Sequence, residues 1–541
     1  MIDKFKRIIE SIKRNGWKTE FRRLFNYLKY KNPIPDDYKE WILMNEMDDK
    51  AIKAAKEYVS WFNIDFAIVV EDEKSIESLE KQIYSKWHLV KKEEILSDDN
   101  QYVVFVGKNV QLSEAALYEV LRAIENRDET AFYSDNDYII DNKRANPIFK
   151  PGFGIDTILS RNYIGDFLVV NTMFLKFHPE ILNNLDSELV YDLILRISNY
   201  TDQIFHIPKI LYHCLEERKQ DYKKQKEIIQ AYLKRNNIKF DSIKDGMYEG
   251  DYKIEYSIIG NPKVSIVIPN MDHIDDLKTL LDSIKESTYS NYEIVIVENN
   301  STEKETFEYY EKIQKEDSKI KVEKLEINYF NYSRIVNYGV EKSSGEYVLL
   351  LNNDIEILTP DWIEQMLMYT QRKDVGACGI KLYFPDKTIQ HAGVTIGIRG
   401  LAGHRYREIS ESDFSKKDYI NIAQDLSAVT AACILVKKSD YVKVLGFDEK
   451  LEVAFNDIDF SMKIRKANLL IVYNPFAYAF HFESKSRGDD TATKETQKRF
   501  MKEYRMFTTR WQETIFRGDP YYNPNFKLDT DIPTINYNKV V

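Results

Sequence analysis

The chain has 541 residues, of which 43% are hydrophobic and 30% are charged, and its net charge is −10. This balance is typical of a soluble globular protein with two or three domains, and it excludes a disordered or fibrous chain. Three scattered cysteines without a CxxC pair indicate a reducing compartment and no zinc site, and the acidic balance predicts no nucleic-acid partner. No stretch approaches the roughly 18 apolar residues of a membrane span, so we expect a cytoplasmic protein.

The first segment of the chain differs from the rest in charge. Residues 1–32 hold ten Lys or Arg against three Asp or Glu, and their apolar residues recur at helical spacing. Basic amphipathic helices of this kind can lie on an anionic membrane, which would make the protein peripheral on the inner face of the cell membrane. They can equally pack against their own domain with a solvated basic face, and the sequence leaves both possibilities open.

From about residue 55 onward, strand and helix patterns alternate, which predicts an α/β protein. A second unit starts at Val264 with the strand "VSIVIPN", the helix "IDDLKTLLDSIKES" and the strand "YEIVIVENNS". Four segments of the first unit resemble four of the second in the same order, which predicts an internal duplication. The matched pairs are 67–83 with 265–284, 102–121 with 347–367, 189–197 with 456–464, and 206–217 with 473–484.

We therefore predict two tandem Rossmann-like domains with helical terminal segments: a basic segment (1–50), a first domain (51–250), a second domain (251–490) and a C-terminal helix and tail (491–541). The two copies differ in their charged residues. Asn109 and Val190 of the first copy match Asp354 and Asp457 of the second, while the first copy keeps a strand-end histidine, His213. The first domain is thus expected to be degenerate, with a structural or acceptor-guiding role.

Polar residues of the second unit fall where ligands bind in open parallel sheets, at the carboxyl ends of strands. "IVIVENNS" ends in Glu298, Asn299, Asn300 and Ser301, which suit hydrogen bonds to a base or ribose. "YVLLLNND" ends in Asp354, and "NPFAYAFHFES" brings His481 to the end of an apolar strand. A carboxylate and an imidazole can together hold a divalent ion, Mg²⁺ or Mn²⁺, that helps a diphosphate to leave.

Two acids in "VAFNDIDFSMKIRKA" open a helix, where the helix dipole favours negative charge. Simple capping explains either one. The functional interpretation is that Asp457 is a general base in the site while Asp459 anchors the turn.

Taken together, "VSIVIPN", "IVENNS", "NND", "FNDIDF" and "HFESKSRG" resemble family 2 glycosyltransferases with a GT-A fold. "FNYSRIVNYG", "TIQHAGVTIG", "LSAVTAACILV" and "DPYYNPNF" resemble the tandem members that build bacterial surface polysaccharides such as O-antigen or capsule. The resemblance implies inverting transfer of a sugar from a nucleotide-diphosphate donor to a hydroxyl of a glycan, which would be lipid-linked. We expected "SAVTAACILV" itself to be a core strand without a chemical role.

The resemblance also assigns roles to residues. Asp457 would be the catalytic base, and Asp354 and His481 would bind the metal. Asn352 and Asn456 replace the acids that the family places in its DxD and ED motifs, which implies weaker metal affinity. The donor would contact Pro269, Glu298, Asn300, Asn352, Asn353 and Arg487, and the acceptor would contact His391 and Asn456.

Two other functions compete with this one. A sugar nucleotidyltransferase would use a similar sheet and metal, but "IPNMDHIDDL" has neither glycine nor a basic residue before Lys278 for a phosphate loop. A non-catalytic glycan-binding or scaffold protein is disfavoured for the second domain because Asp354, Asp457 and His481 occur together.

Overall fold

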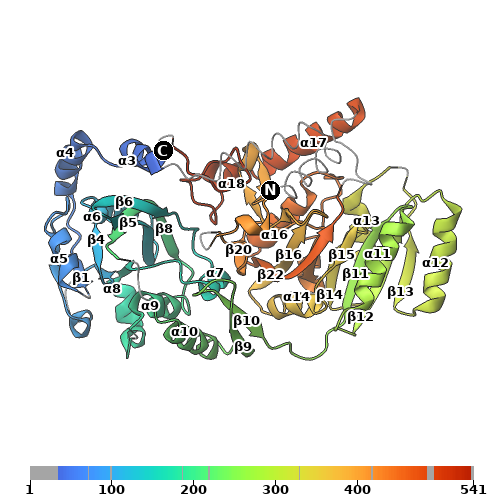
Figure 1. Cartoon of the computed structure of the whole chain (residues 1–541), viewed down its shortest axis with the longest axis horizontal. Helices are drawn as coiled ribbons and strands as arrows, with labels where there is room; N and C mark the ends of the chain where they lie inside the picture. Colours follow the sequence, from blue (N-terminus) through green and yellow to red (C-terminus); the bar gives the residue numbers. More distant parts are fainter. Residues whose placement is uncertain are drawn as a thin grey trace, which may run out of the picture.

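A computed structural model describes residues 35–537, apart from 71, 98–99, 186, 217–219, 328, 416–417 and 484–492. The basic segment 1–32 and Arg487 lie outside these residues, so the expectations about them stay predictions. Two α/β sheets lie along the long axis of the molecule, with the first half of the chain around one and the second half around the other (Figure 1). The predicted fold class, an α/β protein with two Rossmann-like domains, is confirmed.

The described part of the first domain contains an eight-stranded sheet with the strand order β2-β1-β3-β7-β5-β8-β4, and β6 pairs with β5. Its strands are β1 (Phe66–Val70), β2 (Trp87–Leu89), β3 (Tyr102–Val106), β4 (Val110–Leu112), β5 (Ala131–Ile140), β6 (Lys143–Ile148), β7 (Phe167–Asn171) and β8 (Ile204–Cys214). Its helices are α3 (Pro35–Asn45), α4 (Asp49–Tyr58), α5 (Glu73–Leu79), α6 (Ala116–Asn126), α7 (Ile155–Ser160), α8 (Thr172–Phe177), α9 (Leu189–Ile197) and α10 (Tyr222–Arg235). A hairpin of β9 (Phe240–Asp245) and β10 (Tyr252–Tyr256) then leads to the second domain.

The second sheet has the order β13-β12-β11-β14-β21-β16-β22-β15, with β17 on β16 and β20 on β22. Its strands are β11 (Val264–Asn270), β12 (Tyr292–Glu298), β13 (Ile320–Lys324), β14 (Tyr347–Leu351), β15 (Ile355–Ile357), β16 (Val375–Tyr383), β17 (Ile389–His391), β20 (Gln424–Leu426), β21 (Cys433–Lys437) and β22 (Leu470–His481). A separate pair is formed by β18 (Val394–Ile396) and β19 (Ala402–His404). The helices are α11 (Ile274–Lys285), α12 (Lys304–Glu316), α13 (Tyr332–Lys342), α14 (Trp362–Thr370), α15 (Lys438–Lys443), α16 (Asn456–Lys466), α17 (Lys494–Arg510) and α18 (Gln512–Arg517).

The two sheets share one topology, which confirms the internal duplication. Every strand in the order of the first sheet has a counterpart in the second sheet: β2-β1-β3-β7-β5-β8-β4 corresponds to β12-β11-β14-β21-β16-β22-β15. β6 likewise corresponds to β17. The second sheet adds β13 at one edge and β20 beside β22. Both copies also lose register where a proline interrupts the strand, at Pro208 in β8 and Pro475 in β22.

Strand register agrees with the sequence match of the two copies at the end of β8. In the second sheet Ile355 pairs with His481, and in the first sheet the equivalent Val110 pairs with Cys214. Cys214, and not His213, therefore stands where His481 stands, because a shift of one residue moves a side chain to the opposite face. The nitrogen Nδ1 of His213 instead lies 2.5 Å from Oδ1 of Asp137. Asn109 does precede β4 as Asp354 precedes β15, in agreement with the sequence match.

Alternating side chains on the central strands build two apolar layers, as strand geometry requires. Ile266 and Ile268 of β11 pack in the layer that contains α11 and α14, while Val267 packs in the layer with α13 and α16. Because both faces are covered, the strands are apolar along nearly their whole length. Gly339 lets α13 approach the sheet closely, since a Cβ there would lie 2.4 Å from Cγ1 of Val267.

The two domains meet in a buried interface. One cluster of hydrophobic residues continues from the first sheet through α9, α10 and β10 to the second sheet. Polar contacts cross between α7 and the second domain: Asp425 Oδ2 accepts the backbone N–H of Asp156 at 2.7 Å and of Thr157 at 3.3 Å. Arg372 pairs with both Asp156 and Asp374. An interface with this much apolar burial holds two domains in one arrangement.

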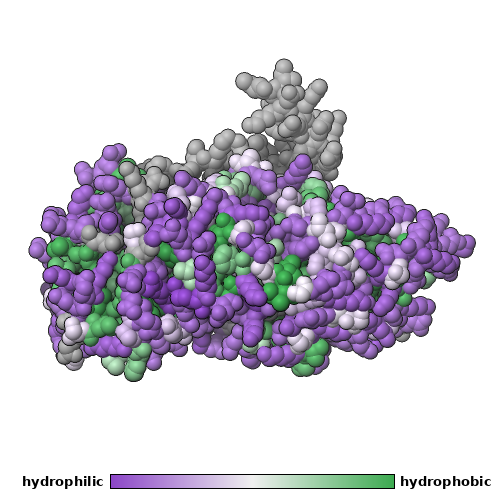
Figure 2. Space-filling model, turned by 90° about the horizontal axis from the view of Figure 1, so that it is seen from below, coloured by the Kyte–Doolittle hydropathy of each residue, from purple (hydrophilic) through white to green (hydrophobic). Residues whose placement is uncertain are grey.

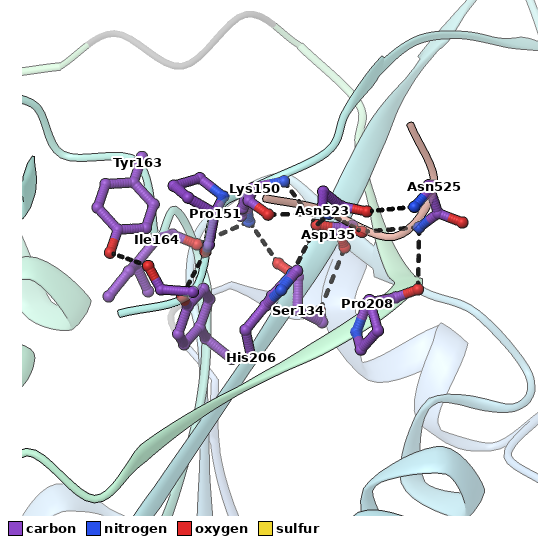
Figure 3. A network of polar contacts seen from close by, with 12 residues as sticks. Ser134, Asp135, Lys150, Pro151, Tyr163, Ile164, His206, Pro208, Asn523 and Asn525 are labelled. Carbon is purple, nitrogen blue, oxygen red and sulfur yellow. Dashed lines mark hydrogen bonds and ion pairs between the residues drawn. The ribbon is translucent and has the colours of Figure 1, made fainter. Parts of the chain in front are cut away.

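A C-terminal strap, residues 519–526, connects the domains a second time. At one end Asp519 accepts the backbone N–H of Ile396 at 2.8 Å and the hydroxyl of Ser427 at 2.8 Å. At the other end Asn523 and Asn525 enter the first domain and donate to the buried carboxylate of Asp135 (Figure 3). The chain thus returns to the domain where it began, and α17 and α18 lie above the second sheet (Figure 1).

The face shown in Figure 2 is mostly hydrophilic, and its hydrophobic residues form separate groups. Within the described residues, every helix is either too short or too polar to cross a bilayer.

Candidate active site

Asp354 and His481 meet at one edge of the second sheet. β14 ends at Leu351, and Asp354 follows just before β15, whose first residue pairs with His481. Nε2 of His481 lies 3.3 Å from Oδ1 of Asp354 and 3.5 Å from Nδ2 of Asn352. Both side chains are buried, and Asp354 Oδ1 and His481 Nδ1 have no hydrogen-bond partner among the described residues. Nε2 of His481 and Oδ1 of Asp354 face each other, and an imidazole nitrogen and a carboxylate oxygen so placed are what a divalent ion would use.

No third acid, cysteine or histidine completes a metal cluster within the described part of the chain. Mg²⁺ and Mn²⁺ sites that act on nucleotides need few protein ligands, because phosphate oxygens and water occupy the other positions. The pair therefore fits such an ion, with the donor's diphosphate supplying the remaining ligands.

Asp457 lies in the first turn of α16 and is partly exposed. Its Oδ1 accepts the backbone N–H of Ile458 at 2.9 Å, and its Oδ2 accepts that of Ala431 at 3.4 Å. Asn456 donates nothing in the described structure: its Oδ1 accepts the N–H of Asp457 at 2.8 Å, while its buried Nδ2 has no partner. Asp459 points elsewhere and receives hydrogen bonds from Arg510 and Trp511. Asp459, the predicted anchor of the turn, and Asp457, the predicted base, thus have different surroundings.

Tyr332 joins the two halves of the site. Its hydroxyl lies 3.3 Å from Oδ1 of Asn352 and 3.3 Å from the carbonyl of Ala431, whose N–H reaches Asp457. Burial, followed by the negative charges of Asp457 and Asp354, raises the pKa of Tyr332 above its usual value. Asp354, His481 and Asp457 therefore converge around one partly buried tyrosine.

Sequence reasoning missed Tyr332 and the backbone of Ala431. Tyr332 lies in "FNYSRIVNYG", a segment that carried the family resemblance without a residue being singled out. The segment "SAVTAACILV" does enter the core strand β21. Before the strand, however, the backbone N–H of Ala431 donates to Asp457 and its carbonyl accepts from Tyr332. The expectation that this segment has no chemical role overlooked its backbone groups.

The residues predicted to bind the donor lie at the ends of β11 and β12. Both oxygens of Glu298 are already engaged, by the N–H and hydroxyl of Ser301 at 2.6 Å each and by the hydroxyl of Tyr310 at 2.8 Å. Asn353 Nδ2 donates to Asn270 Oδ1 at 2.7 Å, and Asn270 donates to Tyr310, so one buried chain of hydrogen bonds links these strand ends. Glu298 shapes this loop by fixing its backbone.

The two other residues predicted to bind the nucleotide-sugar donor lie beside this chain of hydrogen bonds. Pro269 precedes Asn270 and is partly exposed. Asn300 has φ 64° and donates from Nδ2 to the carbonyl of Ile327 at 2.6 Å. Its amide thus holds the loop, and its backbone takes the left-handed conformation that asparagine tolerates.

His391 lies beside His481, fully buried at the end of β17. Its Nδ1 is 2.9 Å from Nδ1 of His404, and its Nε2 has no partner among the described residues. Burial lowers the pKa of His391 well below its usual value, and electrostatic interactions with His404, His481 and Arg405 lower it further. His391 is therefore neutral, with one ring nitrogen available to a ligand.

The sequence of this chain resembles those of known proteins. Residues 265–444 match the sequence profile of Glycosyl transferase family 2. The second half of the chain holds a family 2 glycosyltransferase domain. Over 441 residues the chain is 32% identical to O-antigen biosynthesis protein RfbC of Myxococcus xanthus, which covers 79% of this chain and 34% of that protein.

A second relative, an uncharacterized protein (y4gI) of Sinorhizobium fredii, is 34% identical over 444 residues, which covers 79% of this chain and 48% of that protein. The chain thus spans less than half the length of both relatives. Among solved structures, GalNAc-T7 with UDP, GalNAc and Mn²⁺ superposes with a TM-score of 0.39 at 15% identity, over 54% of this chain and 57% of that one.

Proposed function

We propose that the second domain transfers a sugar, with inversion, from a nucleotide-diphosphate donor to a hydroxyl of a bacterial surface glycan. The observation that carries this proposal is the convergence of Asp354, His481 and Asp457 around Tyr332 within a family 2 glycosyltransferase domain. The similarity to an O-antigen biosynthesis protein supports a surface glycan, lipid-linked during its assembly, as the acceptor.

In the proposed reaction Asp457 accepts the proton of the acceptor hydroxyl as that oxygen attacks the anomeric carbon. Its two backbone hydrogen bonds orient the carboxylate while leaving it partly exposed. Asp354 and His481 would hold Mg²⁺ or Mn²⁺, and such an ion, when bound, neutralises charge on the departing diphosphate. Asn352, next to both ligands, would contact the diphosphate, and Arg487 would do so from outside the described residues.

The nucleotide would bind at the loop that Glu298, Asn300, Asn353 and Pro269 form. On the other side, the partnerless atoms Nδ2 of Asn456 and Nε2 of His391 would donate to or accept from the acceptor's hydroxyls. A buried polar atom without a partner costs free energy, so its persistence is explained if a substrate satisfies it.

The first domain is proposed to be non-catalytic. Asn109 and Cys214 stand where the second domain has Asp354 and His481, and Val190 matches Asp457 in sequence. A scaffold that presents the acceptor to the second domain remains consistent with the buried interface and with the strap.

The experiment is a screen of nucleotide sugars with isolated surface glycan precursors, with and without Mn²⁺, read by mass spectrometry. Asp457→Asn is expected to lower transfer by at least about a hundredfold, in line with loss of a general base. The matched control is Asp440→Asn, an acid in the first turn of α15 and partly exposed like Asp457. Full transfer by Asp457→Asn would refute the base assignment. Conversion of a nucleotide sugar and added pyrophosphate into a nucleoside triphosphate and a sugar 1-phosphate would indicate a nucleotidyltransferase instead.

A further inference from the structure

The segment that carries Asp457, residues 452–459, has an unusual start. α16 begins after Phe455, whose φ of 63° places a bulky residue in the left-handed region, and the side chain of Phe455 does not cap the helix. Such a conformation persists only where surrounding contacts impose it. The side chains of Asn456 and Asp457 accept the first N–H groups of α16, but they do not hold the residues before the helix.

Helix α17 supplies those contacts, although it lies more than thirty residues further along the chain. Glu503 is fully buried, and its carboxylate accepts the backbone N–H of Glu452 at 3.0 Å and of Ala454 at 2.7 Å. The carboxylate thereby holds two backbone N–H groups of the segment that leads into α16, through charge-assisted hydrogen bonds.

Aromatic packing holds the residue with the left-handed conformation. The ring of Phe455 stacks on Phe507 with centroids 5.2 Å apart and lies 5.5 Å from Phe500. Both rings come from the face of α17 that is turned toward the base segment. Contacts of this kind exceed simple area burial in strength and fix ring orientation.

Beyond Asp457, the end of the same helix secures the next turn of α16. Oδ1 of Asp459 accepts from Nη1 of Arg510 and from Nε1 of Trp511, each at 2.8 Å. Contacts with α17 and with Trp511 thus hold the base segment both before and after Asp457. The carboxylate can face the substrate while its backbone is held from behind.

The same segment is tied to the rest of the site. The carbonyl of Glu452, whose N–H is held by Glu503, accepts the N–H of Tyr332 at 2.8 Å. Tyr332 is the residue that contacts both Asn352 and Ala431. A shift at Glu503 would therefore move the base and the tyrosine that joins the base to the metal-binding pair.

We propose that α17 is a positioning element for the proposed base, with Glu503 as its principal positioning residue and Phe507 and Trp511 as supports. This inference rests on the proposed function, because it concerns the alignment of Asp457 with the acceptor hydroxyl. It assigns the C-terminal helix a role in turnover.

The test compares Glu503→Gln with Glu495→Gln, the same substitution at an exposed position in the first turn of the same helix. Glutamine keeps the shape of the side chain but offers one carbonyl oxygen to two N–H groups. We expect faster hydrogen–deuterium exchange in residues 452–459, a kcat lowered about ten- to a hundredfold and an unchanged KM for the donor. The control is expected to match the wild type in all three measurements.

A folded Glu503→Gln protein with wild-type exchange and wild-type kcat would overturn the proposal, and an equal change in KM and kcat for the donor would indicate a general structural role instead. If Glu503→Gln does not fold, Trp511→Phe replaces it, since phenylalanine keeps the ring but removes the N–H that reaches Asp459. Exchange is measured without substrate. Absence of transfer by the wild type would therefore count against the proposed function, while exchange would still decide the positioning.

Discussion

Replacing Asn523 with alanine is expected to detach the C-terminal strap from the first domain. Asn523 is 2% exposed, and its amide nitrogen lies 2.9 Å from Oδ2 of Asp135 and 2.8 Å from the carbonyl of Lys150. Its side-chain oxygen accepts the N–H of Asn525 at 2.9 Å. Alanine removes all three hydrogen bonds and leaves the buried carboxylate with fewer donors.

The expected cost follows from the type of each bond. A hydrogen bond to a charged group contributes about 1.5–3 kcal/mol and a neutral one about 1 kcal/mol, so the three together amount to about 3–5 kcal/mol. Because about 1.4 kcal/mol corresponds to a factor of ten, the detached strap should become at least about a hundredfold more populated.

Cleavage by trypsin after Lys527, just beyond the strap, measures that population. Lys527 is held in the attached state, since its N–H donates to Thr534 and its carbonyl accepts from Tyr522. When reattachment is faster than cleavage, the cleavage rate tracks the population of the detached form. Asn291→Ala serves as control, because Asn291 makes one exposed hydrogen bond to the carbonyl of Asn261. Cleavage of Asn523→Ala at the wild-type rate would refute the reasoning.

Two further predictions concern pH and membranes. Burial, with the negative charge of Asp156, raises the pKa of Asp425 to about 8, so the folded protein retains a proton that the unfolded chain releases near its ordinary pKa. The free energy of unfolding that this group contributes is complete below that ordinary pKa and is lost as pH rises through about 8. We therefore expect Asp425→Asn to raise the melting temperature more at pH 9 than at pH 6. An equal increase in melting temperature at both pH values would contradict this expectation. We also expect the full chain to sediment with vesicles of anionic phospholipid through residues 1–32, and sedimentation of a chain without them would exclude that role.

Local pattern predicted the duplication because each matched segment is a complete strand or helix with its own periodicity. The strand ends also placed Asp354 and His481 correctly at one edge of the sheet, since β15 pairs with β22. The matched segments 206–217 and 473–484 already align Cys214 with His481, and the pairing of Val110 with Cys214 confirms that alignment.

The sequence alone did not predict the contacts between segments that lie far apart in the chain. Tyr332 gains its place through the carbonyl of Ala431, a backbone group that any residue would supply. Glu503 appears in the sequence as one of many charged residues in a polar amphipathic helix, and its burial follows only from the N–H groups it meets. Charge alone predicts exposure for such a residue, and only the three-dimensional partner reverses that expectation.

The C-terminal segment links these observations physically. Its first part, α17, grips the base segment of the second domain, and its last part, the strap, is held by Asp135 in the first. A displacement of the C-terminal segment at the strap can therefore move the backbone around Asp457 without a change in either sheet. If the first domain binds the growing glycan, the strap connects that domain, through its hydrogen bonds to Asp135, with the helix behind the base. Measuring exchange at residues 452–459 in Asn523→Ala tests this directly: unchanged exchange would show that the two ends of the segment act independently.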